Sequence, residues 1–227
     1  MASSEFLVNN LVILGVGLMG GSLALAAKCA GAVKTVTGWS RTQRTLDKAL
    51  ASGVIDRAEA DFDRAISEAD VVVVATPTQY AEQLMIDVLD RVGESVAVTD
   101  VASVKGNIYR RLVQHYGALP RNAVLGHPIA GSEKSGVDAA FADLYVDRRV
   151  ILIADSANDT KLAAKVCALW EAVGAEVDFM TPDKHDEVLA LTSHLPHFLA
   201  YALVAQLSEG DNACLLYTSP SPRDFTE

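Results

Sequence analysis

Three glycines near the N-terminus have the spacing that binds the phosphates of a nucleotide. Gly15, Gly17 and Gly20 lie between an apolar run at 11–14 and an apolar helical pattern at 18–30. In this context the first glycine permits a tight turn, the second lets backbone amides approach a pyrophosphate, and the third allows close helix packing. Unpaired amides and the helix dipole favour an anion there. The motif predicts a dinucleotide site, although a glycine turn without a ligand is the alternative. The further predicted cofactor contacts are Leu18, Met19 and Thr76.

The end of the second predicted strand favours NADP, with NAD as the second choice. NAD-binding proteins usually place Asp or Glu about twenty residues after the glycines, where it accepts a bond from the ribose 2′-hydroxyl. This chain has Ser40 and Arg41 at that point, with Arg44 following a turn later. A carboxylate repels a 2′-phosphate, whereas Ser and Arg bind one through charge-assisted hydrogen bonds. In the alternative interpretation, Arg41 is a solvated residue at the start of a helix.

A second set of residues with chemical potential follows later predicted strands. The segments at 99–106, 126–136 and 193–197 contain polar side chains at positions where strand ends meet a cofactor crevice. His127 follows a predicted strand and precedes Pro128, and an imidazole is the natural acceptor of an alcohol proton near neutral pH. A lone histidine is more often structural. Small and polar neighbours favour the functional interpretation for His127.

These segments, together with the glycine motif, resemble the prephenate/arogenate dehydrogenase family of tyrosine biosynthesis. The resemblance covers residues 10 to about 210, and its specific motifs are His-Pro-x-x-Gly-Ser-Glu-x-Ser-Gly at 127–136 and His-Leu-Pro-His at 194–197. It implies that His127 contacts the ring hydroxyl of the substrate and aids hydride transfer, with support from Ser103. It also implies that Glu133 helps to gate the site. The substrate-binding residues predicted on this basis are Ser132, Glu133, His194 and His197.

The resemblance implies an oxidative decarboxylation of prephenate or arogenate, with hydride transfer to NAD(P). One alternative is another NAD(P)-dependent dehydrogenase, of the β-hydroxyacid or imine-reducing type. Such enzymes usually rely on a lysine of the second-domain helix, where this chain offers Lys184 at the start. Another alternative is a nucleotide-binding module without catalysis. His194 and His197 share a helix face, but the sequence shows no further ligands beside them, so no metal is expected.

Apolar runs that alternate with helical patterns must position these residues. This alternation predicts an α/β fold over residues 1–181, a Rossmann-like, doubly wound, mostly parallel sheet that is covered on both faces. The predicted strands are 11–14, 33–38, 70–75, 95–100, 123–126, 149–153 and 176–179. The predicted helices are 18–30, 41–52, 79–90, 105–116 and 159–173.

The pattern changes after Thr181, which suits a helix N-cap before Pro182. A helical segment at 186–207 is apolar on nearly every face and therefore must be buried. We interpret 182–210 as the start of an all-α dimerisation domain, and we expect a homodimer from the full-length protein. In that interpretation the segment 186–207 lacks its partners, the chain is truncated, and its turnover is poor or absent.

The last residues, 211–227, have neither helical nor strand periodicity. The stretch 215–224 resembles a translated adapter-derived ending, and a natural disordered terminus is the alternative. In the related family an Asp-Phe-Thr-Arg segment supplies the arginine that binds the ring carboxylate. Here Asp224, Phe225 and Thr226 precede Glu227, so that arginine is missing.

Charge and cysteine content exclude several partner classes. The net charge of −10 argues against nucleic acid and anionic membranes. The three cysteines, Cys29, Cys167 and Cys214, share no metal-type spacing and suit reduced thiols in the cytoplasm. The apolar stretch at 11–27 lacks a preceding basic residue and is interrupted by the glycines, so we expect neither a signal peptide nor a membrane span.

Overall fold

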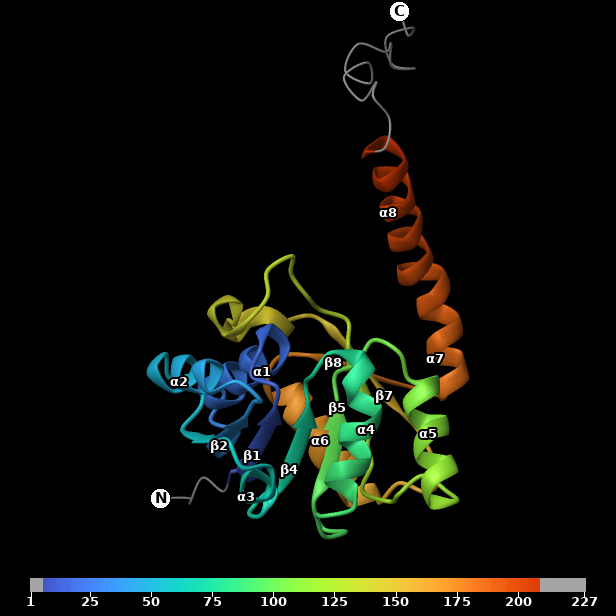
Figure 1. The fold of residues 1–227 in the computed structure, drawn as a ribbon. Helices are drawn as coiled ribbons and strands as arrows, with labels where there is room; N and C mark the ends of the chain where they lie inside the picture. The colour runs from blue at the N-terminus through green and yellow to red at the C-terminus, as the bar shows by residue number, and fades with distance from the viewer. Residues whose placement is uncertain (1–5, 209–227) are drawn as a thin grey trace, which may run out of the picture. The chain divides into compact units, whose positions relative to one another are not determined.

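The computed structural model of the chain describes residues 6–208 (Figure 1). These residues belong to two compact units, one that ends at Asp186 and one that begins at Glu187. The predictions for Cys214, for 215–224 and for the segment from Asp224 to Glu227 lie outside the described residues.

A five-stranded parallel sheet forms the centre of the first unit, with strand order β3-β2-β1-β4-β5. This order reverses between β1 and β4, as in doubly wound nucleotide-binding folds, so the predicted fold class is confirmed. The strands are β1 (Val8–Leu14), β2 (Val33–Trp39), β3 (Arg57–Glu59), β4 (Val71–Val74) and β5 (Ala97–Asp100). The connecting helices are α1 (Leu18–Cys29), α2 (Gln43–Ala51), α3 (Phe62–Ile66), α4 (Thr78–Leu89) and α5 (Gly106–Tyr116).

Alternate residues of the central strands pack into two separate cores. In β1, Leu11 and Ile13 face a core that includes residues of α1 and α6 (Thr160–Ala172), whereas Val12 and Leu14 face residues of α4 and α5. The four consecutive valines of β4 divide between the two cores in the same way and are fully buried. Because both faces of the sheet are covered, the centre of the sheet, at 11–14 of β1 and throughout β4, is apolar without interruption.

A smaller sheet continues beyond β5. It contains β6 (Gly126–Pro128), β7 (Arg149–Ile153) and β8 (Glu176–Met180), with β6 antiparallel to β7 and β7 parallel to β8. The strand predicted at 123–126 is wrong in its position, because Ala123 makes a single parallel bridge to Val98 and the strand itself begins at Gly126. Two short 3-10 helices, η1 (Val137–Ala139) and η2 (Ala142–Tyr145), lie between β6 and β7.

A helical segment follows β8. The hydroxyl oxygen of Thr181 accepts a hydrogen bond from the Lys184 amide at 3.3 Å, and Pro182 is the first residue of α7 (Pro182–Leu189), as predicted. In the second unit a π-helix, η3 (Ala190–His194), leads into α8 (Leu195–Ser208). The exposed large apolar side chains of this unit are Leu191, Leu195, Phe198, Leu199, Tyr201, Leu203, Val204 and Leu207.

Within residues 6–208, the helical stretch 182–208 is long and apolar enough to cross a membrane by length and composition alone. Core helices of soluble proteins share this property, so it is weak evidence for a membrane. The stretch at 11–27 forms β1, the glycine turn and part of α1, which makes it part of the core of the first unit.

Candidate active site

The glycine turn between β1 and α1 has the geometry that its spacing predicts. Gly15 has φ +103°, and a Cβ there would lie 2.6 Å from the Ala75 carbonyl oxygen. A Cβ on Gly20 would lie 2.5 Å from the Gly15 carbonyl oxygen. Apart from its immediate neighbours along the chain, no described residue has an atom within 4 Å of the place where a Cβ of Gly17 would be. Two glycines therefore allow close packing, and the third faces open space.

The N-terminus of α1 offers hydrogen-bond donors to that space. Gly17 is the N-cap and supplies no side-chain cap, and the first helical bond runs from the Gly21 amide to the Gly17 carbonyl at 2.8 Å. Helix geometry leaves the amides before Gly21 without helical partners. The buried hydroxyl oxygen of Thr76 also has no partner among the described residues. These donors fit the pyrophosphate and ribose of NAD(P), so the residues at this end suit the cofactor.

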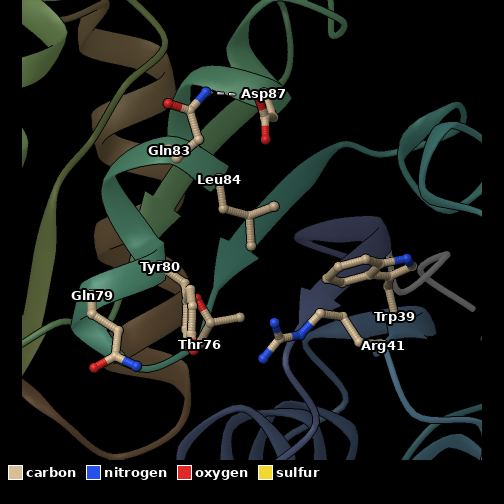
Figure 2. Close-up of a pocket in the computed structure, with 8 residues that line it drawn as sticks. All are labelled: Trp39, Arg41, Thr76, Gln79, Tyr80, Gln83, Leu84 and Asp87. Atoms are coloured by element: carbon tan, nitrogen blue, oxygen red, sulfur yellow. Dashed lines mark hydrogen bonds between the residues drawn. The ribbon is translucent and has the colours of Figure 1, made fainter.

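A crevice runs from this turn across the end of β2 towards α4 (Figure 2). It consists of adjoining cavities of about 230 and 250 Å³ that share Trp39, Arg41 and Thr76. The guanidinium of Arg41 lies over the ring of Tyr80, 4.6 Å from its centroid. Hydrogen bonds with Gln79 and with Arg41 hold the pKa of the Tyr80 hydroxyl below its ordinary value.

The other residues predicted to distinguish the two nucleotides lie at the same strand end. Ser40 lines the 250 Å³ cavity, and its hydroxyl accepts a hydrogen bond from the Thr42 amide at 3.2 Å. Arg44 is exposed on α2 and is not among the residues that line the cavity. Arg41 is the charged residue among those that line this cavity, and the lining residues include Ser40 and no carboxylate.

A third cavity, of about 400 Å³, adjoins the glycine turn on its other side. Gly17, Leu18 and Met19 line it from α1, Ser103 lines it from the loop after β5, and His127 lines it from β6. His127 is buried, with 8% of its surface exposed. This cavity brings the predicted catalytic pair, Ser103 and His127, next to the predicted phosphate-binding turn.

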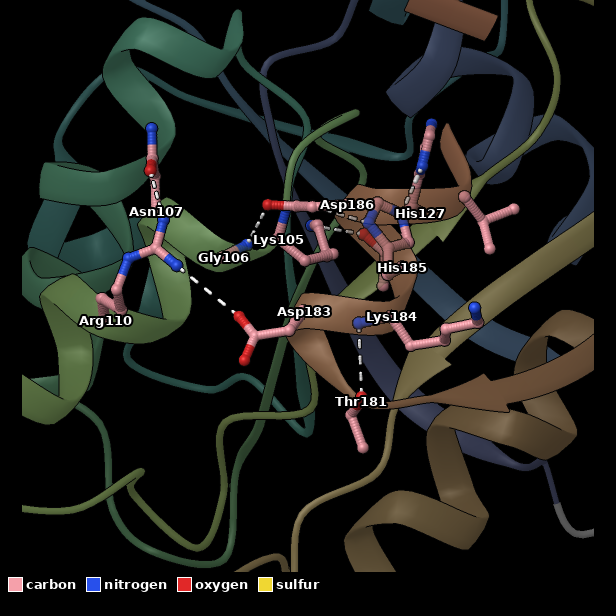
Figure 3. A network of polar contacts seen from close by, with 12 residues as sticks. Lys105, Gly106, Asn107, Arg110, His127, Thr181, Asp183, Lys184, His185 and Asp186 are labelled. Carbon is pink, nitrogen blue, oxygen red and sulfur yellow. Dashed lines mark hydrogen bonds and ion pairs between the residues drawn. The ribbon is translucent and has the colours of Figure 1, made fainter. Parts of the chain in front are cut away.

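His127 belongs to a buried chain of hydrogen bonds (Figure 3). Its Nδ1 lies 2.8 Å from Nε2 of His185, whose Nδ1 lies 2.8 Å from Oδ1 of Asp186. The same carboxylate accepts bonds from the backbone amides of Lys105 and Gly106, each at 2.9 Å. Asp186 therefore caps the N-terminus of α5 and contacts the imidazole that contacts His127.

A second buried pair fixes the strand on which His127 lies. The Lys105 ammonium pairs with Asp100 and donates to the Gly126 carbonyl at 2.7 Å, and Asp100 accepts from the Gly126 amide at 3.1 Å. Both side chains are fully buried. Since Gly126 is bonded through its carbonyl and its amide, the pair holds β6 against the end of β5.

Burial and hydrogen bonding shift the pKa values in this network in definite directions. Burial lowers the pKa of Lys105, although Asp100 opposes the shift. Burial also lowers the pKa of His185 below its ordinary value, against the opposing effect of Asp186. Burial would raise the pKa of Asp186, but bonds from the Lys105 amide, His185 and the Gly106 amide hold it below its ordinary value.

The predicted substrate-binding residues lie in two places. Ser132 and Glu133 are exposed in the loop after β6, with the Ser132 hydroxyl 3.3 Å from a Glu133 oxygen. They do not line the 400 Å³ cavity, whereas Lys134 from the same loop does. His194 and His197 belong to the second unit, where Nδ1 of His197 lies 2.9 Å from the Ser193 carbonyl oxygen. Within the described residues, no three His, Cys, Asp or Glu side chains form a group that could hold a metal.

Comparison with family models decides what kind of protein this is. The nucleotide-binding domain of prephenate dehydrogenase matches residues 23–179, and the dimerization domain of prephenate dehydrogenase matches residues 181–226. The chain belongs to the prephenate dehydrogenase family. Members of this family are oxidoreductases that carry out NAD(P)-dependent oxidative decarboxylation in tyrosine biosynthesis, and the chain has the NAD(P)-binding domain of that class.

Individual relatives agree with this assignment. The chain is 32% identical to the cyclohexadienyl dehydrogenase of Zymomonas mobilis, over 96% of this chain and 75% of that protein. It is 33% identical to the prephenate dehydrogenase of Bacillus subtilis, over 90% of this chain and 55% of that protein. The crystal structure of prephenate dehydrogenase from Aquifex aeolicus, in complex with hydroxyphenyl propionate and NAD+, matches with a TM-score of 0.86 and 32% identity. That match covers 99% of this chain and 77% of the other.

Sequence reasoning missed His185, Asp186 and the buried role of Lys105 in this family member. A signal existed: the five residues from Asp183 to Glu187 are all titratable, and they begin three residues after the end of β8. In a parallel arrangement, a strand end is where functional side chains gather. The sequence alone does not show that 58 residues separate two histidines whose rings are in contact.

Proposed function

We propose that this chain oxidises and decarboxylates prephenate or arogenate, with His127 as the group that accepts the proton of the substrate hydroxyl. One observation carries the proposal. The 400 Å³ cavity is lined both by the α1 phosphate-binding turn and by Ser103 and His127. A cofactor held at the turn and a cyclohexadiene substrate beside His127 would therefore share one cavity, as transfer between two bound molecules requires.

The roles of the residues follow from the chemistry of this substrate. The substrate has a hydroxyl on C4 and a carboxylate on C1 of a cyclohexadiene ring. When bound, the nicotinamide supplies the hydride acceptor for the hydrogen on C4. His127 takes the hydroxyl proton, and Ser103 holds the hydroxyl in line by a hydrogen bond. The electrons of the C1–CO₂ bond then pass into the ring as CO₂ leaves, the ring becomes aromatic, and the proton held on His127 returns to the ring oxygen. Since aromatisation supplies much of the driving force, the protein mainly orients the rings and moves one proton.

The cofactor that suits the crevice best is NADP. Ser40 and Arg41 line the cavity at the end of β2, at the point where a ribose 2′-phosphate would lie, and Arg44 follows on α2. The stacking of Arg41 on Tyr80 supports the proposal, because it holds the guanidinium at the crevice wall. NAD remains the second candidate, since the Aquifex aeolicus enzyme was crystallised with NAD+.

The remaining assignments concern substrate contact, assembly and location. We assign His197, His194, Ser132 and Glu133 to substrate contact and gating, on the strength of the motifs that contain them. The exposed apolar side chains of α8 and the match to a dimerization domain support a homodimer. The domain boundary near 181 and a cytoplasmic location, with no membrane or nucleic-acid partner, belong to the same proposal.

The direct test is an assay with prephenate and with arogenate, each with NADP and with NAD, of the purified chain and of a version extended by the C-terminal domain of a family member. Reduction of the cofactor is followed by absorbance, and release of CO₂ is measured in parallel. In the extended version we expect both signals in equal amounts with at least one substrate, and faster turnover with NADP, whereas the chain alone should turn over poorly. Cofactor binding without turnover of either substrate by the extended version would contradict the proposal and favour a nucleotide-binding module. Reduction without CO₂ release would favour a dehydrogenase of another type.

A further inference from the structure

We propose that Asp186 and His185 are positioning residues that fix which nitrogen of His127 accepts the proton. The inference rests on the proposed function, because it takes His127 as the proton acceptor. Neither residue touches the cavity that His127 lines, so both would act through His127. The observation that carries the inference is the unbroken contact from the Asp186 carboxylate to His185 and on to His127.

The contacts of Asp186 fix its charge and the hydrogen of its imidazole partner. Its two oxygens face the amides of Lys105 and Gly106 and the Nδ1 of His185, and both amides are donors. A carboxylate that accepts several N–H bonds at a helix N-terminus is stabilised as the anion. Only a donor can complete its third contact, so Nδ1 of His185 carries a hydrogen.

The surroundings of His185 favour a neutral ring. Its ring is fully buried, and the groups that face it are Asp186, the Lys105–Asp100 pair and His127. The opposite charges of Lys105 and Asp100 largely offset each other at this ring, and burial favours the neutral imidazole. A neutral imidazole with its hydrogen on Nδ1 has a lone pair on Nε2.

The contact with His185 gives His127 the same tautomer, with a hydrogen on Nδ1 and a lone pair on Nε2. Since Nε2 of His185 is an acceptor, the 2.8 Å contact requires the hydrogen on Nδ1 of His127. The lone pair of His127 is then on Nε2, which is the atom that takes the substrate proton. Without an acceptor at His185, His127 would also populate the tautomer with its hydrogen on Nε2, and that form cannot accept a proton there.

The same contacts also serve the protonated state. When Nε2 of His127 takes a proton, its Nδ1–H still points to the lone pair of His185, and the anionic Asp186 lies behind that ring. The positive charge thus forms beside a preorganised acceptor, with no rearrangement of the neighbours. The arrangement follows the logic of a catalytic imidazole that is oriented by a carboxylate, here through one additional ring.

A spectroscopic measurement on the unmodified chain tests the inference without any assay. Long-range ¹H–¹⁵N correlation spectra of the histidine-labelled protein, bound to NADP at neutral pH, report the hydrogen on each ring nitrogen. His127→Asn and His185→Gln variants assign the signals. We expect a hydrogen on Nδ1 and a lone pair on Nε2 for both His127 and His185. A hydrogen on Nε2 of either ring would overturn the proposal, whether or not the chain turns over substrate.

Two substitutions of His185 separate positioning from plain structural support. In His185→Gln the amide oxygen can still accept the Nδ1–H of His127, whereas His185→Leu removes the acceptor. We expect kcat to fall about 10- to 100-fold in His185→Leu, the range typical of partners that orient an imidazole, with NADP affinity unchanged. The kcat of His185→Gln should be much closer to that of the unmodified chain. Equal kcat values in the two variants would contradict the role of the acceptor.

The outcomes distinguish this inference from the proposed function. If prephenate and arogenate are not oxidised but the spectra show the expected tautomers, the proposed function fails and the hydrogen-bond pattern stands. If either substrate is oxidised and His127→Asn abolishes turnover, while the spectra show the opposite tautomer, the proposed function stands and this inference fails.

Discussion

The glycine turn and the 400 Å³ cavity beside it supply their functional groups in different ways. At the turn, here called the phosphate end, the groups are backbone amides, and glycines at 15, 17 and 20 make that turn possible. At the His127 side of the cavity, here called the reaction end, the groups are side chains: His127 contacts His185, 58 residues later, and Asp186 caps a helix that begins about 80 residues earlier. A site made of backbone amides depends on the spacing of a few neighbouring residues. A network of side chains from distant positions forms only when the chain folds.

Replacement of His127 should have the largest effect and should be confined to the reaction end. Asparagine keeps a polar group at the position but cannot take a proton, and acid–base roles are typically worth about 10²–10⁴-fold. In a version of the chain extended by the C-terminal domain of a family member, we expect His127→Asn to lower kcat within that range. NADP affinity, measured by fluorescence titration, should remain unchanged, because the phosphates are proposed to bind at the glycine turn. Near-normal kcat, or a loss of cofactor binding instead, would show that His127 is structural.

This difference between the two ends also explains what the sequence predicted. The glycine turn, its strand and its helix were predictable because spacing and apolar runs are local signals. The strands β1, β2, β4, β5, β7 and β8 and the helices α1, α2, α4, α5 and α6 were predicted within a few residues, because they carry apolar runs or helical periodicity.

The elements that were missed carry weak local signals. Arg57–Glu59 is a three-residue edge strand with an exposed first residue and no apolar run, and Phe62–Ile66 is a single helical turn that Asp61 caps. The strand at 126–128 was placed too early because Ala123, Val124 and Leu125 are the buried apolar residues before it. The apolar run at 123–125 indicated a strand at those residues. The residues that pair with β7 are Gly126, His127 and Pro128.

Substitution of Gly15 should damage the phosphate end by breaking its backbone geometry. An alanine there would adopt φ +103° and place its Cβ 2.6 Å from the Ala75 carbonyl oxygen. We expect Gly15→Ala to destabilise the chain by about 2–4 kcal/mol and to weaken NADP binding. Gly53→Ala is the matched control, because Gly53 has φ +71° with no described atom within 4 Å of its Cβ position. It should lose about 1 kcal/mol, from backbone strain alone. Equal losses of unfolding free energy in Gly15→Ala and Gly53→Ala, measured by urea denaturation, would contradict the steric explanation.

Substitution of Arg41 should affect one cofactor and spare the other. Its guanidinium is proposed to bind the 2′-phosphate, and a hydrogen bond to a charged group is worth about 1.5–3 kcal/mol. We expect Arg41→Ala to weaken NADP by that amount and to leave NAD nearly unchanged, as measured by parallel fluorescence titrations. Arg44→Ala is the control, because Arg44 follows Arg41 by three residues but does not line the cavity. This substitution should change NADP affinity less. Equal affinity of the unmodified chain for NAD and NADP would show that the nucleotide assignment is wrong.

The smallest effect concerns pH, and it should distinguish the reaction end from the phosphate end. The folded pKa of His185 lies below the 6.5 of an ordinary histidine, so the unfolded chain binds more protons between the two values. The contribution of His185 to stability is therefore complete above pH 6.5 and declines as the pH falls, by at most about 1.4 kcal/mol per pH unit. Asp186, whose pKa is also lowered, adds a further loss below its unfolded value of 3.8.

Urea denaturation of the unmodified chain and of His185→Gln, at several pH values between 7.5 and 5, checks this prediction. The free energy of unfolding should fall less steeply with decreasing pH in His185→Gln, because glutamine does not titrate. Gly15→Ala should keep the slope of the unmodified chain, since it removes no titrating group. Parallel curves for the unmodified chain and His185→Gln would contradict the assignment of His185 as a buried neutral histidine.

The cap that Asp186 provides has a consequence for the order in which the protein is made. The last residue of the first unit closes a helix that begins at Gly106, and it does so through bonds that span 80 and 81 residues. The glycine turn and Thr76 leave the ribosome much earlier. At common rates of synthesis, the roughly 110 residues between Thr76 and Asp186 take about 5 to 20 seconds. During that interval the nascent chain has its phosphate-binding groups, while the first turn of α5 waits for its carboxylate and His127 waits for the ring that orients it.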